Sequence, residues 1–253
     1  MSLTQAAEAT GVLVTELRDT FGERLESVTL YGSVPRHESV QGVSDINVLV
    51  ILDEVVLDDL RRISPIAGHC VELGRSGPRL FGAEEFRRSA DAFAIEMADL
   101  LEQRQVLYGR DPVAGIEVPR ESLRHQLEHE IRARHIQLRA GLMLAAPLPE
   151  AVGGLLEDGL PAYVCYLRAV LRLAGRSVPD SSEDVIRAAS NVVGARPDAF
   201  LDAWGARKAG SMVVVAIDDP LVAGYLEIIE RAIAWVDGQG SDRAPERTPV
   251  AGD

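Results

Sequence analysis

Lysine is almost missing from this chain of 253 residues, in which Lys208 is the only one. Arginine makes up the rest of the 26 basic residues, and 39 acidic residues bring the formal net charge to −13. Proteins that bind DNA or RNA neutralise phosphates with clustered Lys and Arg. A general nucleic-acid binder is therefore not expected, and a small molecule or a protein is the favoured partner.

Cysteine and long hydrophobic runs are also scarce. Cys70 and Cys165 stand alone without metal-ligand spacing, so we expect both to fill apolar space. No window approaches the roughly 20 apolar residues that a membrane-spanning helix needs. Residues 1–21 lack the charged segment and the apolar stretch of a signal peptide. These absences predict a cytoplasmic protein without a disulfide framework.

The distinctive feature of the chain is residues 30–52, LYGSVPRHESVQGVSDINVLVIL. Residues 26–31 read as a short strand that places Val28 and Leu30 on one face. We expect the strand to end at Gly32, because glycine readily adopts the positive φ that lets a phosphate approach the backbone closely.

A helical turn after Ser33 would complete a phosphate site. The unpaired amides of such a turn point at one spot, and the Ser33 hydroxyl adds another donor. Pro35 suits the start of a helical turn, since its missing N–H would be unpaired there anyway. Arg36 follows and can add a positive charge beside a bound phosphate.

Two polar residues open the next strand, residues 46–52. Asp45 and Asn47 are two positions apart, so in a strand their side chains project from the same face. Two carboxylates placed this way can hold Mg²⁺ or Mn²⁺ against a triphosphate. Asn47 supplies an amide oxygen without the charge. Ser44 precedes the pair as a further candidate for nucleotide binding, although Ser44 and Asp45 could also form only a turn.

The pattern Gly-Ser, spacer, Asp-x-Asp on a strand is that of the DNA polymerase β-type nucleotidyltransferase superfamily, which this segment resembles. Gly32, Ser33 and Asp45 match the pattern, and Asn47 stands where the second Asp belongs. The resemblance implies a third carboxylate on a later strand of the same sheet. Glu96 is the best candidate and Asp99 the second, because their segment ends in QVLYG, residues 105–109, like many bacterial members.

The resemblance extends to the plan of the whole chain. Residues 78–112 followed by a helical second half look like a group of bacterial nucleotidyltransferase-domain proteins, and the aminoglycoside nucleotidyltransferases share this plan. The implied fold class is α+β, a mixed sheet with helices joined to a C-terminal all-α bundle. The predicted domains are 1–112, a linker at 113–119, a helical domain at 120–237 and a disordered tail at 238–253.

Apolar periodicity gives the expected elements. Helices are expected at 3–21, 55–73 and 83–89, with a kink or break in the second at Pro65 and Gly68, and a short strand at 79–81. In the second half, helices are expected around 123–142, 150–174, 181–193, 197–207 and 218–236, with 152–173 the most buried part. Residues 212–217, MVVVAI, are ambiguous between helix and strand.

The implied activity is transfer of a nucleoside monophosphate from an NTP to a hydroxyl of a small molecule or protein. Asp45, Asn47 and Glu96 are the predicted catalytic and metal-binding residues, and Mg²⁺ or Mn²⁺ is the predicted ion. Gly32, Ser33, Arg36 and Ser44 are predicted to bind the nucleotide. Because Asn47 removes one negative charge, a catalytically degenerate nucleotide-binding or regulatory module stays open. A homodimer is possible.

A third possibility is that the chain is one half of a toxin–antitoxin pair, as an antitoxin-like partner of a helical ribonuclease. A ribonuclease function of this chain itself would rest on Arg124 and His129, which have the Arg-x4-His spacing of such ribonucleases, with His125 and His135 nearby. Positions five apart do not share one helix face, and a helix rich in Glu, Arg and His is usually a solvated surface. His69 is expected to be solvated or to cap a helix. Three aromatic residues are expected in the core or an interface: Tyr163, Tyr166 and Trp204.

Overall fold

The computed structural model describes residues 3–32, 46–72 and 77–240. The chain divides into two compact units, Met1–Pro119 and Arg120–Asp253, and each is described by itself. Within the described residues, no helix has the length and apolar character needed to cross a membrane. The predicted tail falls mostly beyond residue 240, outside the described part.

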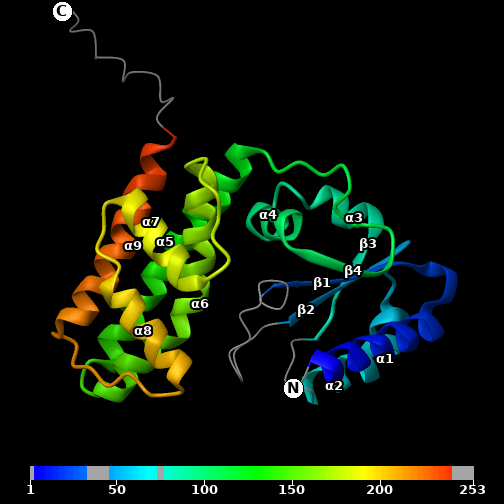
Figure 1. The fold of residues 1–253 in the computed structure, drawn as a ribbon, viewed down its shortest axis with the longest axis horizontal. Coiled ribbons are helices and arrows are strands. Elements are labelled where there is room, and N and C mark those ends of the chain that lie inside the picture. The colour runs from blue at the N-terminus through cyan, green and yellow to red at the C-terminus, as the bar shows by residue number, and fades with distance from the viewer. Residues whose placement is uncertain (1–2, 33–45, 73–76, 241–253) are drawn as a thin grey trace, which may run out of the picture. The chain divides into compact units, whose positions relative to one another are not determined.

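The first unit mixes helices with a four-stranded sheet (Figure 1). Its elements are α1 (Leu3–Phe21), the short 3-10 helix η1 (Gly22–Arg24), β1 (Leu25–Gly32), β2 (Ile46–Leu52), α2 (Leu57–Glu72), β3 (Arg79–Gly82), α3 (Ala83–Arg88), α4 (Ala94–Glu102) and β4 (Arg104–Gly109). The strand order is β3-β2-β1-β4. β1 runs antiparallel to both β2 and β4, whereas β2 and β3 are parallel. The expected mixed α+β fold is confirmed.

One face of the sheet is covered by α1 and α2 (Figure 1). Alternate residues of the central strands point to this face, including Val28 and Leu30 of β1 as predicted. They pack in a cluster with two residues of β2, Val48 and Val50. The helices contribute side chains at helical spacing: Leu13, Leu17 and Phe21 from α1, and Ile63, Ile66 and Cys70 from α2. Cys70 is buried among these apolar side chains and belongs to no disulfide, as expected.

The opposite face carries α3 and α4 (Figure 1). Tyr31 of β1 and Leu49 of β2 lie here with Ile51, in the positions that alternate with the first cluster. The helices add Ala83, Phe86, Met97 and Leu100. The middle of the sheet is therefore buried on both sides, which explains the nearly unbroken apolar run of residues 46–52.

The expected break in α2 is wrong. The helix runs without interruption from Leu57 to Glu72 through Pro65 and Gly68. Pro65 is exposed, so water can hydrate the carbonyl that loses its intrahelical bond. The buried residues on the other side of α2 hold the helix against the sheet. His69 is exposed, as expected.

The second unit is helical throughout its described elements (Figure 1). They are α5 (Arg120–Ala145), α6 (Pro149–Leu173), α7 (Ser182–Val193), α8 (Asp198–Ala209) and α9 (Pro220–Gly238). α6 is lined with buried residues, as predicted for 152–173. Tyr163, Tyr166 and Trp204 are buried, with exposures of 1%, 7% and 9%. Residues 212–216 form neither helix nor strand.

The segment after α8 crosses α6 at a glycine. An ideal Cβ at Gly153 would lie 1.7 Å from the Val213 carbonyl oxygen, so only glycine lets the two backbones approach this closely. The Val213 N–H donates to the carboxylate of Glu157, one turn further along α6. This contact fixes the course of residues 212–216 over the bundle.

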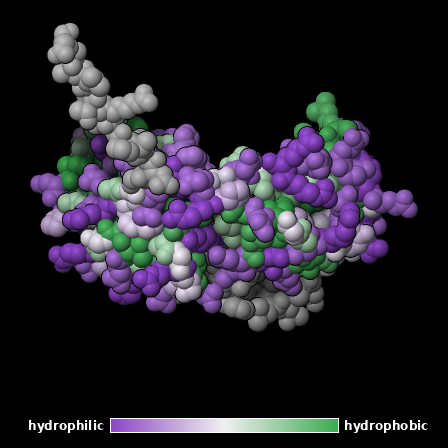
Figure 2. All heavy atoms as spheres, turned by 90° about the horizontal axis from the view of Figure 1, so that it is seen from above, coloured by the Kyte–Doolittle hydropathy of each residue, from purple (hydrophilic) through white to green (hydrophobic). Residues whose placement is uncertain are grey.

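Hydrophilic side chains cover much of the face shown in Figure 2, with hydrophobic side chains between them in smaller groups. Large exposed hydrophobic residues occur in both units; in the second they include Ile136, Met143, Leu144 and Leu148. Singly exposed apolar residues are ordinary on protein surfaces.

Gly153→Ala and Gly154→Ala form a matched pair of substitutions on α6. We expect Gly153→Ala to lower the free energy of unfolding by about 3 kcal/mol, because the added methyl overlaps the Val213 carbonyl. Gly154 has nothing within 4 Å of its Cβ position, so alanine there should raise stability by about 1 kcal/mol through helix propensity. Urea denaturation measures both values, and equal effects would contradict the packing.

Asp59 is a second stability determinant, with a side chain only 1% exposed. Arg24 donates to both carboxylate oxygens, at 2.8 and 2.9 Å, and this guanidinium lowers the pKa of Asp59. We expect Asp59→Asn to lower the melting temperature at pH 7 by roughly 5 °C. Asp58→Asn, which removes an exposed carboxylate, should change it little.

The same pair predicts a pH dependence. A carboxylate with a depressed folded-state pKa stabilises the fold above its unfolded pKa, roughly 4, and that contribution is lost as the pH falls through the folded value. The melting temperatures of the wild type and Asp59→Asn should therefore begin to converge below about pH 4 and meet only below the depressed folded-state pKa of Asp59. A difference in melting temperature that stays constant down to about pH 2 would contradict this origin.

Candidate functional site

The candidate site lies where β1 ends and β2 begins. Gly32 has a φ of 98°, the positive value expected from the sequence, and it pairs across the sheet with Ile46. Gly32 and Ile46, the described residues on either side of positions 33–45, are therefore neighbours in the sheet. The predicted site residues within this stretch lie outside the described residues: Ser33, Arg36, Ser44 and Asp45.

Tyr31 and Asn47 are the next pair along the two strands. They lie directly opposite each other in the antiparallel register, so their side chains share one face of the sheet. This face also carries Leu49 and is the one covered by α3 and α4. Tyr31 is 7% exposed and Asn47 is half-buried.

Glu96 reaches the same place from a helix. It lies in the first turn of α4, half-buried, and its charge raises the pKa of Tyr31. The expectation that Glu96 belongs to a strand is wrong. Ala94, Ile95, Met97 and Ala98 are buried at helical spacing, which suits a helix packed on the sheet. Asp99 follows one turn later and is also half-buried.

Arg79 is the residue of this face that the sequence did not single out. It opens β3 opposite Leu49 in the parallel register, and its guanidinium carbon lies 5.9 Å from the centre of the Tyr31 ring. The short strand at 79–81 was predicted, but the sequence carries no signal that β3 joins the edge beside β2. The neighbour of a strand depends on tertiary packing, which periodicity does not encode.

The phenol of Tyr31 is a neutral donor. Burial raises its pKa above the ordinary value near 10, the Arg79 guanidinium lowers it, and the Glu96 carboxylate raises it. The net direction is upward, so the hydroxyl keeps its proton at neutral pH and can donate a hydrogen bond. Tyr31 is therefore influenced by one cation and one anion.

Arg104 holds α4 in place from the other neighbouring strand. It lies opposite Tyr31 on β4 and binds Asp111 with two hydrogen bonds, one of 2.8 Å. It also donates to the last-turn carbonyls of Leu100 and Leu101, at 3.1 and 2.7 Å. The Arg104 guanidinium lowers the pKa of Asp111. This pair closes the helix whose first turn carries Glu96.

The described part of the site offers few metal ligands. Within residues 3–32, 46–72 and 77–240, no group of three or more His, Cys, Asp or Glu side chains could hold a metal ion. Of the predicted ligands, Asn47 and Glu96 both lie around Tyr31, and Asp45 is outside the described residues. An amide oxygen and two carboxylates would fit one hard cation completed by substrate phosphates.

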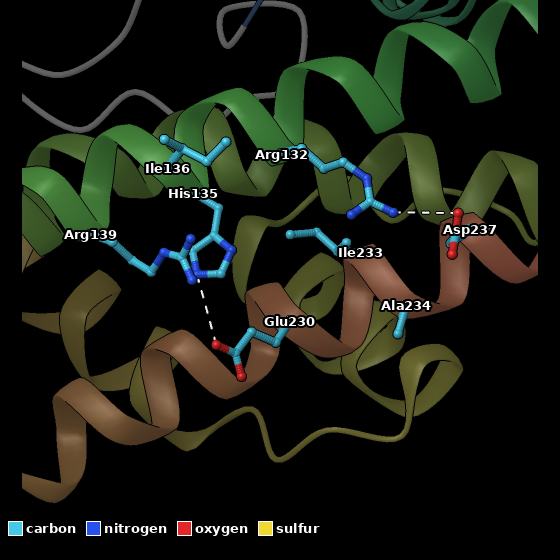
Figure 3. A pocket seen from close by; sticks show the side chains of 8 residues that line it. All are labelled: Arg132, His135, Ile136, Arg139, Glu230, Ile233, Ala234 and Asp237. Carbon is cyan, nitrogen blue, oxygen red and sulfur yellow. Dashed lines mark ion pairs between the residues drawn. The ribbon is translucent and has the colours of Figure 1, made fainter.

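A separate groove lies on the helical unit between α5 and α9 (Figure 3). Its volume is about 510 Å³, and one face of each helix lines it. His135 lies 3.8 Å from Glu230, and Arg132 lies 3.3 Å from Asp237. Burial and Arg139 lower the pKa of His135, whereas Glu230 raises it. These pairs join the two helices within the bundle.

The Arg-x4-His spacing does not form one cluster on α5. Arg124 is 9% exposed and paired with Glu121 and Glu128, at 3.2 and 2.9 Å. The expectation of a solvated surface is therefore wrong for Arg124, because two flanking carboxylates on its own helix allow its burial. His129 is exposed, as expected.

The described elements share the fold of a solved adenyltransferase, in line with the α+β fold that the resemblance to the polymerase β-type superfamily implies. The chain is similar to the spectinomycin adenyltransferase AAD(9) from Enterococcus faecialis, solved with ATP and spectinomycin. The TM-score is 0.60 at 12% identity, over 89% of this chain and 98% of that one. No family model and no curated protein matches this chain.

A second solved structure, a mutant of the toxin–antitoxin pair MntA-HpeT, matches 53% of this chain and 94% of its own at 15% identity. Its TM-score is 0.28, so it carries no argument about this chain. The antitoxin-like reading accordingly stays a prediction.

Asn47→Asp tests whether the missing charge is what limits metal binding. Because hard cations prefer carboxylates, we expect Mg²⁺-dependent ATP affinity to rise about tenfold, measured by calorimetry. Asn191→Asp adds the same charge to an exposed position of α7 and should leave the affinity unchanged. An Asn47→Asp protein with unaltered metal dependence would show that this side chain does not face the ion.

Proposed function

We propose that this chain is a nucleotidyltransferase that binds an NTP at the end of β1 and transfers its nucleoside monophosphate to a hydroxyl. The observation that carries the proposal is the meeting of four features around the paired ends of β1 and β2: the positive φ of Gly32, Asn47 opposite Tyr31, Glu96 and Arg79. The AAD(9) structure, which has this fold, was solved with ATP.

Gly32, Ser33, Arg36 and Ser44 would hold the triphosphate, and Asp45, Asn47 and Glu96 would hold Mg²⁺ or Mn²⁺. A bound divalent ion supplies charge neutralisation for the phosphates. The acceptor oxygen attacks the α-phosphorus in line, forms the new P–O bond and displaces pyrophosphate. The Glu96 carboxylate takes the proton of the acceptor hydroxyl as general base.

The acceptor is proposed to be a small molecule or a protein. The net charge of −13 opposes binding to DNA or RNA. The AAD(9) structure was solved with spectinomycin as well as ATP, which supports a small-molecule acceptor for a chain of the same fold. We further propose that the protein acts in the cytoplasm, and a homodimer stays possible.

A nucleotide-binding module without transferase activity is the second candidate. Two residues favour this module because they weaken metal binding. Asn47 removes a negative charge from the predicted metal site, and Arg79 adds a positive charge near it. Such a module would bind nucleotide and act through contacts with another protein. The two candidates share the binding site and differ in turnover.

Calorimetric titration of ATP, GTP, CTP and UTP into the purified protein tests the site. With Mg²⁺ or Mn²⁺ we expect tighter binding than with a chelator, and Asp45→Ala should lose that metal-dependent gain. Pyrophosphate release in an acceptor screen then separates the two candidates. Glu96→Gln should lower turnover at least a hundredfold and should also reduce the metal-dependent gain in affinity, because it removes a charge from the proposed metal site. The absence of nucleotide binding in every buffer would contradict both.

A further inference from the structure

Arg79 crosses the face of the sheet on which the nucleotide would bind. β3 and β1 are separated by β2, so their backbones lie about 10 Å apart at the usual strand spacing. The Arg79 guanidinium nevertheless lies 5.9 Å from the Tyr31 ring centre on β1. The side chains of Arg79 and Tyr31 therefore meet over β2.

Asn47 projects from this same face of β2. It lies beside Tyr31, and Arg79 opens β3 opposite Leu49, two residues further along β2. The guanidinium is thus placed over the strand that carries the Asp-x-Asn motif. Arg79 is exposed, so a ligand on this face can reach it.

The Tyr31 ring fixes the position of this cation. A guanidinium within about 6 Å of an aromatic ring is attracted to its face. The attraction leaves the N–H groups at the edge of the guanidinium available, and these match the oxygens of a phosphate in a fork of two parallel hydrogen bonds. The Tyr31 hydroxyl keeps its proton, so it carries no negative charge that would compete with a phosphate for the Arg79 guanidinium.

Resting on the nucleotidyltransferase function proposed above, we propose that Arg79 binds the triphosphate oxygens and replaces part of the positive charge that a second metal ion would supply. Asn47 fits this arrangement, because a neutral amide at this position adds no negative charge that Arg79 would have to offset when no metal ion is bound. The substrate class is a nucleoside triphosphate whose binding is only partly metal-dependent.

Arg79→Met tests the proposal by calorimetry with ATP, in Mg²⁺ and in chelator. The wild type should retain weakened but measurable ATP binding in chelator. Arg79→Met should lose roughly 10-fold to 100-fold in affinity with Mg²⁺, the size of one charge-assisted hydrogen bond, and should lose detectable binding in chelator. Arg79→Lys keeps the charge but not the fork, so its affinity should fall between the two.

Two controls separate this role from a structural one. Arg61→Met removes an exposed arginine of α2, the helix on the opposite face of the sheet, and should leave ATP affinity unchanged. Melting temperatures identify any variant that is misfolded. In Arg79→Met, the affinity for AMP should change less than the affinity for ATP, because AMP lacks the β- and γ-phosphates.

Unchanged Mg²⁺-dependent affinity in Arg79→Met, or complete loss of wild-type binding in chelator, would overturn the role of Arg79 and leave the nucleotidyltransferase proposal intact. No ATP binding by the wild type under any condition would overturn the proposed function itself. The two failures are therefore distinguishable in one set of titrations.

Discussion

The antiparallel pairing of β1 with β2 is the constraint on which the first unit depends. These strands form the middle of the sheet, with a hydrophobic cluster on each face. A register shift of one residue would exchange the two faces and break both clusters, so burial fixes the register. The same register places Tyr31 opposite Asn47 and Gly32 opposite Ile46. Packing of the core thus determines which polar groups share the candidate site.

Much of this arrangement could be predicted from the sequence because it depends on local patterns. Two strands are predicted by the alternation of residues 26–31 and the apolar run of residues 46–52. The glycine at position 32 predicts the positive φ at which the first strand ends. Helical spacing predicted the second unit, and α6 is its most buried helix over much of its length. In each case the pattern of burial repeats at the period of the element.

The remaining features depend on contacts between distant segments. Glu96 was placed on a strand because the resemblance implied one, yet its neighbours bury themselves at helical spacing on α4. Arg79 belongs to a predicted strand, but its role follows from the parallel pairing of β3 with β2. Pro65 looked like a break, and packing of α2 against the sheet outweighs the lost hydrogen bond. Tertiary context decided all three.

The central claim is that nucleotide phosphates bind on the sheet face around Tyr31. Fluorine NMR of protein containing 3-fluorotyrosine tests it directly, because the chain has five tyrosines and Tyr31→Phe identifies one resonance. On addition of ATP with Mg²⁺, the account predicts that the Tyr31 resonance shifts most, and that Mn²⁺ in place of Mg²⁺ broadens it. An unchanged Tyr31 resonance at saturating ATP, with shifts confined to tyrosines of the helical unit, would contradict the account.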